Sequence, residues 1–132
     1  MPINHSTISK GFILAGLMNL TVLIFSRGFT NETIPEFDPV VMSNFGLLMI
    51  VLWGLAYVAV AKKYQAVKWL VAVFAVEKII YGYVWIQWML DNRISEVFEK
   101  DVMAGTFYAI YGINDILFAL FFLFVFFRLS KS

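Results

Sequence analysis

The chain has 132 residues, of which 61% are hydrophobic and 14% are charged, and its net charge is +1. A typical soluble domain is about 45–50% apolar and about 25% charged, and a globule this small has too little interior to bury the difference. This composition excludes an ordinary soluble domain, and the absence of cysteine excludes a disulfide scaffold. It predicts an integral membrane protein.

Four apolar segments follow one another along the chain, each near the length that crosses a hydrocarbon core of about 30 Å. Helices are expected because a spanning segment must satisfy its own backbone polar groups, and no alternating barrel pattern is present. The sequence therefore predicts a single domain, residues 1–132. Its fold class is an all-α integral membrane protein, a four-transmembrane-helix antiparallel bundle. The predicted spans are residues 8–26, 42–61, 67–90 and 102–127.

The three connections between these spans differ in character. Residues 27–41 contain Pro35 and Pro39, so we expect a segment ordered only by packing at the surface. The second connection is only a few residues long, which predicts a tight hairpin of the second and third spans. In the third, residues 94–100 place apolar side chains at i, i+3 and i+4. That spacing favours a short interfacial helix over an early start of the fourth span.

The charged residues outside the spans divide by sign. One side of the predicted bundle carries six basic residues and no acidic ones: Lys10, Lys62, Lys63, Lys68, Arg128 and Lys131. The other side carries Arg27, Arg93 and Lys100 together with Glu32, Glu36, Asp38, Asp91, Glu96, Glu99 and Asp101. Because cytoplasmic loops are enriched in lysine and arginine, we expect both termini to be cytoplasmic. A bacterial inner (plasma) membrane is the expected location.

Three ionisable residues lie near the middle of predicted spans: Glu77 and Lys78 in the third, and Asp115 in the fourth. A charge at the bilayer centre costs about 2.5–3.5 kcal/mol on insertion scales, so such groups face the bundle interior and often mark functional sites. Adjacent residues of a helix do not face each other. Asp115 is therefore the natural partner of Lys78 across the bundle, and Asn19 or a tyrosine hydroxyl is a candidate partner for Glu77.

Other polar and aromatic side chains reach the same depth, counted at about 1.5 Å per residue. Their convergence predicts a polar centre with aromatic walls that binds a ligand or a proton. The alternative is structural pairing that only fixes helix register, but hydrogen bonds of this kind average about 0.6 kcal/mol in membranes, which is a poor reason to keep three ionisable groups. The candidate site residues are Glu77, Lys78, Asp115, Asn114, Tyr81, Tyr111, Asn19 and Trp53.

The remaining aromatic and small residues of the spans have simpler interpretations. Trp69 and Trp88 lie near the two ends of the third span, where tryptophans commonly form interfacial belts. Gly82 and Gly112 each follow a tyrosine and are interpreted as points of close helix packing.

Several classes of function lack the residues they need. With no cysteine and one histidine, His5, the chain offers almost no ligands for haem or zinc, so neither a metal site nor a cofactor is expected. The few basic residues lie along the membrane surface, where they set topology, and nucleic-acid binding is not expected.

Three hypotheses remain. The favoured one is a buried polar site that binds, and as a transporter would translocate, a small organic ligand or a proton. Four short helices enclose little volume, so we expect a homo-oligomer, with a dimer favoured, surrounded by membrane lipids. The second is an intramembrane acid–base enzyme or a lipid-ligand receptor, with no catalytic residue assigned. The third is an accessory subunit of a larger membrane complex. The sequence names no substrate.

Overall fold

The computed structural model describes residues 4–131, and within them the chain is helical, with no strands. Four longer helices carry most of the chain, and short helices lie in the connections. In chain order the helices are α1 (His5–Leu20), α2 (Val22–Phe25), α3 (Thr33–Phe37), α4 (Asn44–Val60), the 3-10 helix η1 (Tyr64–Ala66), α5 (Lys68–Asp91), α6 (Ile94–Lys100) and α7 (Val102–Ser130).

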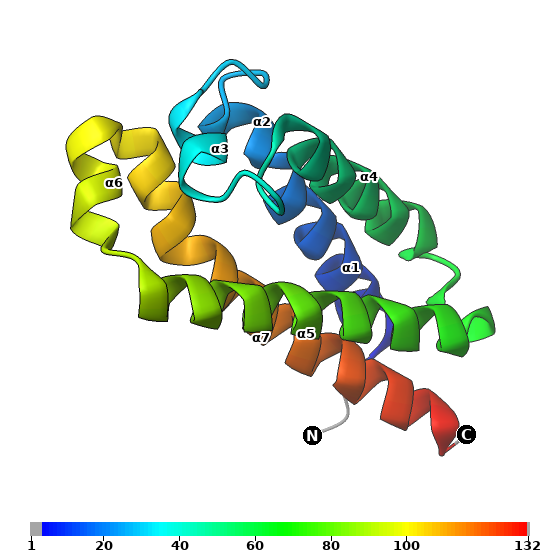
Figure 1. The fold of residues 1–132 in the computed structure, drawn as a ribbon. Helices are drawn as coiled ribbons and strands as arrows, with labels where there is room; N and C mark the ends of the chain where they lie inside the picture. The colour runs from blue at the N-terminus through cyan, green and yellow to red at the C-terminus, as the bar shows by residue number, and fades with distance from the viewer. Residues whose placement is uncertain (1–3, 132) are drawn as a thin grey trace.

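The four longer helices form two pairs. α1 packs against α4, and α5 packs against α7 along most of its length, whereas α1 and α7 contact each other at few positions (Figure 1). Both chain termini lie at one end of the molecule, which we call the terminal end. α2, α3 and α6 gather at the opposite end, which we call the connector end.

Three helical segments are long and apolar enough to cross a membrane: His5–Phe25, α5 and α7. The fourth apolar helix, α4, has 17 residues and rises about 26 Å, slightly less than a hydrocarbon core of about 30 Å. The prediction of an all-helical chain is therefore confirmed for the described residues, and three of the predicted spans are long and apolar enough to cross a membrane. The fourth span and the side of the membrane on which the termini lie stay predictions.

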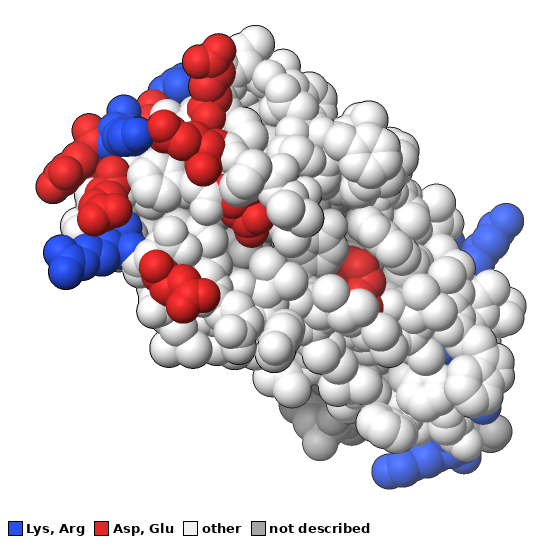
Figure 2. Space-filling view, in the orientation of Figure 1, with Lys and Arg blue, Asp and Glu red and all other residues white. Residues whose placement is uncertain are grey.

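Charged side chains collect at the two ends of the molecule. In Figure 2, acidic side chains and some basic ones cover the connector end, and the basic side chains of the other end stand apart from acidic ones. Between the two ends the surface is almost entirely uncharged, broken by a small acidic patch. Long apolar side chains dominate this middle surface, as expected for a face that contacts lipid.

Two details of the first span and its connection differ from the prediction. The segment predicted to be ordered only by packing contains α3, in which Pro35 occupies the first turn, where its missing N–H leaves no helical hydrogen bond unmade. The first span is not one helix, because it is interrupted at Thr21, between α1 and α2. The hydroxyl of Thr21 donates to the carbonyl of Met18 at this break.

The third connection contains the predicted short helix, and its position at the membrane interface stays a prediction. α6 (Ile94–Lys100) is a separate short helix that buries Val97. Asp101 then begins α7 as its N-cap, with a carboxylate oxygen accepting from the N–H of Ala104 at 2.8 Å. The same carboxylate accepts from Arg27 and Asn31, each at 2.7 Å, so it ties the α2–α3 connection to the start of α7.

Glycines allow close contact within both helix pairs. A Cβ at Gly112 of α7 would lie 1.9 Å from the indole of Trp85 on α5, so only glycine fits there. In the other pair, a Cβ at Gly16 of α1 would lie 2.6 Å from the carbonyl oxygen of Gly54 on α4. The interpretation of Gly112 as a close-packing point is confirmed.

Two aromatic clusters fill the interior, one towards each end. The terminal cluster contains Phe12, Phe74 and Phe122, whose ring centroids lie 5.3–6.4 Å apart. In the connector cluster Trp88 stacks on Tyr108 at 4.3 Å and is buried, so the prediction that Trp88 belongs to an interfacial belt is wrong. Its indole N–H instead donates to a backbone carbonyl of α3.

Candidate functional site

Lys78 of α5 is the centre of a polar cluster between the two aromatic clusters. Its side chain is 1% exposed, and its ammonium donates to Asp115 Oδ1 of α7 at 3.0 Å and to Asn19 Oδ1 of α1 at 2.8 Å. The ammonium also lies 5.1 Å from the ring centroid of Tyr57 on α4. One side chain of α5 therefore touches all three of the other long helices.

Two side-chain amides extend this cluster. The Nδ2 of Asn19 donates to the backbone carbonyl of Ile50 on α4 at 2.9 Å. Asn19 reaches that backbone because Gly54 lies one turn further along α4, and a Cβ at Gly54 would be 2.7 Å from the Cβ of Asn19. The Nδ2 of Asn114 donates to Asp115 Oδ1 at 3.0 Å. Both donors to the Asp115 carboxylate among residues 4–131 thus use the same oxygen, which leaves Oδ2 available to a further donor.

Glu77 belongs to a separate contact. The hydroxyl of Tyr57 donates to Glu77 Oε1, and both side chains are buried. Tyr57 was not among the predicted site residues. It lies five residues before the short connection of residues 62–66, whereas Glu77 lies eleven residues after it, so counting residues from that connection does not bring the two to the same depth. The sequence held no clear signal for this contact.

Tyr111 of α7 carries a polar atom with no partner. The residue is 7% exposed, and its hydroxyl is buried without a hydrogen bond to any described residue. Its ring stacks on Phe107 at 5.2 Å, one turn towards the connector end. An unsatisfied buried hydroxyl costs about 1–3 kcal/mol, so its presence needs an explanation.

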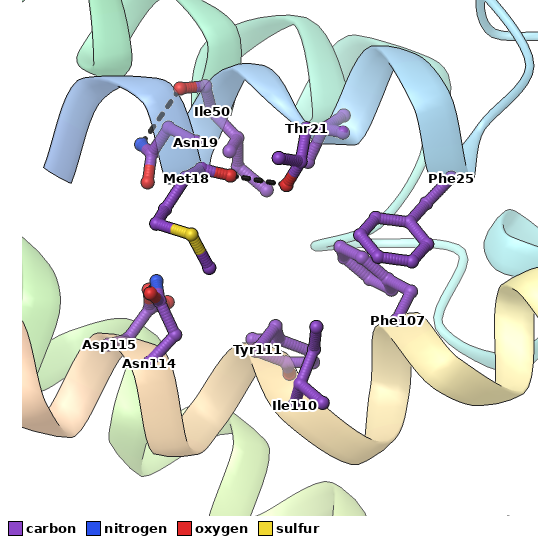
Figure 3. A pocket seen from close by; sticks show the side chains of 11 residues that line it. Met18, Asn19, Thr21, Phe25, Ile50, Phe107, Ile110, Tyr111, Asn114 and Asp115 are labelled. Carbon is purple, nitrogen blue, oxygen red and sulfur yellow. Dashed lines mark hydrogen bonds between the residues drawn. The ribbon is translucent and has the colours of Figure 1, made fainter. Parts of the chain in front are cut away.

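A cavity of about 30 Å³ lies beside the polar cluster, between α1 and α2 on one side and α7 on the other (Figure 3). Met18 projects from α1 across the space towards Asn114 and Asp115, and Phe25 and Phe107 close its connector end. This volume is large enough to hold at least one water molecule or a group of similar size. The cavity is lined by Met18, Asn19, Thr21, Val22, Phe25, Ile50, Phe107, Ile110, Tyr111, Asn114 and Asp115.

The predicted site residues are thus not all in one place. The cavity wall includes Asn19, Tyr111, Asn114 and Asp115. Lys78 lies behind this wall, held by two of its members, and Glu77 faces Tyr57. Trp53 and Tyr81 lie elsewhere: the ring of Trp53 packs edge-on against Phe74 in the terminal cluster, and Tyr81 packs against the connector cluster.

Met18, Phe25 and Phe107 also line the cavity, and sequence reasoning missed them. Nothing distinguishes these three from the many other apolar residues of the spans. Their role depends on the small contact between α1 and α7, which no single-sequence pattern reveals.

Comparisons with known proteins return no match: no protein-family model, no curated protein and no solved structure matches this chain.

The cavity wall offers hydrogen-bonding groups of complementary kinds. Asp115 Oδ2 can only accept, and the Asn114 amide can donate and accept. The charge of Asp115 is balanced by Lys78 at 3.0 Å, so the wall carries no excess charge at this point. Such a surface suits a small, uncharged polar group.

Proposed function

We propose that this chain is a four-span membrane protein, with both termini in the cytoplasm, that binds a small ligand at the Lys78–Asp115 cluster within the membrane. The placement of both termini at one end of the molecule supports an even number of spans. The excess of basic residues at that end supports its cytoplasmic location. An inner bacterial membrane remains the location we favour.

One observation carries the binding proposal: the cluster lines a cavity. A polar cluster that served only to fix the helices would be sealed inside the bundle with all its groups paired. Here one carboxylate oxygen of Asp115 accepts no hydrogen bond from the described residues, and a donor in the cavity would satisfy it. The hydroxyl of Tyr111, which also has no partner among the described residues, lies one turn away on α7.

Binding is favoured over translocation and catalysis by what surrounds the cluster. On the terminal side the rings of Phe12, Phe74 and Phe122 pack against one another and fill the interior with apolar side chains. The Glu77 carboxylate, the other candidate acid–base group, faces Tyr57 and is not part of the cavity wall. A single chain supplies the whole cavity, so this proposal does not require the dimer expected from the sequence.

Native mass spectrometry of the protein released from mild detergent tests the proposal. We expect a one-to-one small-molecule adduct on the wild type, regained after delipidation when an organic extract of the host membranes is added back. Asn114→Leu, at the cavity wall, should lose the adduct. Gln87→Leu, which changes an exposed polar residue of α5, should retain it. A wild type that carries no adduct before or after addition of the extract would refute the proposal.

A further inference from the structure

The polar cavity continues into an apolar groove on the surface of the bundle. The groove is lined by Gly11, Leu14, Met18, Asn114, Leu117, Phe118 and Phe121. Met18 and Asn114 line both the groove and the cavity, so the two spaces meet at these side chains. α1 and α7 contact each other at few positions, which leaves room for the groove between them.

This groove opens sideways, towards the region that lipid would occupy. Leu14 and Leu117, on its two edges, are 53% and 60% exposed. It runs along α1 from Met18 towards the terminal end for about seven residues, or about 10 Å. There the ring of Phe121 covers Gly11, at which a Cβ would lie 2.4 Å from the ring. An apolar chain is the occupant whose chemistry matches this lining.

The other two routes to the cavity are covered. At the connector end Phe25 and Phe107 pack together, with ring centroids 6.2 Å apart. Beyond them, the Asp101 carboxylate joins Arg27 and Asn31 and so fastens α2 to the start of α7. At the terminal end the terminal cluster closes the interior. A ligand therefore enters between α1 and α7, from the bilayer.

The cavity wall restricts the polar group that can enter. A carboxylate would face the Asp115 carboxylate, and an ammonium would have to leave water for hydrocarbon at high cost. A ketone or quinone only accepts, and would leave Asp115 Oδ2 unpaired. A hydroxyl both donates and accepts, so it can donate to Asp115 Oδ2 and accept from the amide of Asn114.

Resting on the proposed function, we propose that the ligand is a membrane-soluble alcohol, with one hydroxyl in the cavity beside Asp115 and its hydrocarbon chain in the groove between α1 and α7. Met18 lies where the two parts of the ligand would meet (Figure 3). Its unbranched thioether chain is the kind of side chain that adapts to an irregular occupant.

The test uses a diazirine-bearing C16 alcohol in phosphatidylcholine liposomes that contain the full chain. We expect saturable photolabelling confined to peptides of α1 and α7, competed by hexadecanol. Methyl hexadecyl ether, which cannot donate, should compete about tenfold less well, close to the factor expected for one lost hydrogen bond. Equal competition by the ether, or unsaturable labelling of every lipid-facing helix, would overturn the proposal.

Two variants locate the site. Met18→Trp places an indole at the junction and should reduce saturable labelling about tenfold. Leu17→Trp, on the neighbouring exposed position of α1, should leave it unchanged. The comparison of alcohol and ether on the wild type decides the matter if Met18→Trp does not fold.

Failure of this inference can be separated from failure of the binding proposal. If the mass-spectrometric adduct depends on Asn114 but hexadecanol does not displace it, the alcohol is the wrong ligand and the binding site stands. If there is neither an adduct nor saturable labelling, both proposals are wrong.

Discussion

Substitution of Lys78 by methionine tests whether the ion pair is needed for folding. The side chains of Lys78 and Asp115 are 1% and 9% exposed, so the pair is a buried one. Loss of one partner of a buried pair costs about 3–5 kcal/mol, because the other charge stays buried without compensation. Neutral hydrogen bonds in membranes average about 0.6 kcal/mol, which is too small to describe this change. We expect Lys78→Met to lower the free energy of unfolding by about 3–5 kcal/mol.

The double variant Lys78→Met with Asp115→Leu gives the decisive comparison. Replacement of a whole buried pair by apolar side chains is often neutral or stabilising. Asn19 would lose its ammonium donor but keep its hydrogen bond to the carbonyl of Ile50. We therefore expect the double variant to unfold within about 1 kcal/mol of the wild type, or to be more stable.

The assay is reversible unfolding by SDS in mixed micelles, followed by far-ultraviolet circular dichroism. Lys10→Met, at an exposed position of α1, is the matched control and should change little. If the double variant is destabilised by the sum of the single changes, the two residues act independently and the reasoning fails. A stable double variant that no longer carries the adduct would mean that the pair is retained for binding.

Three further predictions follow from single contacts. Removal of the unpaired hydroxyl in Tyr111→Phe should raise the free energy of unfolding by about 1–2 kcal/mol. Tyr108→Phe, which loses a hydrogen bond to a carbonyl of α3, should instead lower it by about 1–3 kcal/mol. The SDS assay measures both variants, and equal effects would contradict the assignment of a paired and an unpaired hydroxyl. Gly112→Ala should destabilise by about 1–3 kcal/mol or more, because its methyl group would overlap an indole of α5, and an unchanged unfolding curve would refute the close contact. The hydrogen bond from Arg27 holds the pKa of Asp101 below its ordinary value of 3.8, so this carboxylate stabilises the fold above that pH and loses its contribution as the pH falls below it. Between pH 7 and pH 3 the free energy of unfolding should therefore fall less in Asp101→Asn than in the wild type. An identical pH dependence of the two proteins would contradict this role of Asp101.

The apolar lengths of the spans predicted the helices well, since backbone satisfaction in hydrocarbon leaves few alternatives. The interruption at Thr21 was not predictable, because threonine is common within helices and its hydrogen bond to Met18 is one of several it can make. α3 was missed because Pro35 was weighed as a helix breaker, although proline is tolerated in the first turn.

The charged residues of the site could be predicted from the sequence, but the cavity beside them could not. Glu77, Lys78 and Asp115 stand out because charges are rare at this depth, and the cost of exposing them to lipid requires that they turn inward. Gly16 allows α1 to approach α4 closely, and Gly112 allows α7 to approach α5 closely. The contact between α1 and α7, which belong to different pairs, is small. A cavity that arises from a missing contact has no pattern of its own in the sequence.

The polar cluster also suggests how a ligand in the groove would affect the packing of the helices. α1 and α7 contact each other at few positions, and Lys78 joins them by donating to Asn19 on one and Asp115 on the other. A hydroxyl that donates to Asp115 Oδ2 would share this carboxylate with Lys78 and so compete for its charge. A ligand that enters between the two helices and donates to Asp115 would therefore act on a polar link between them, and we expect its binding to be coupled to the spacing of α1 and α7.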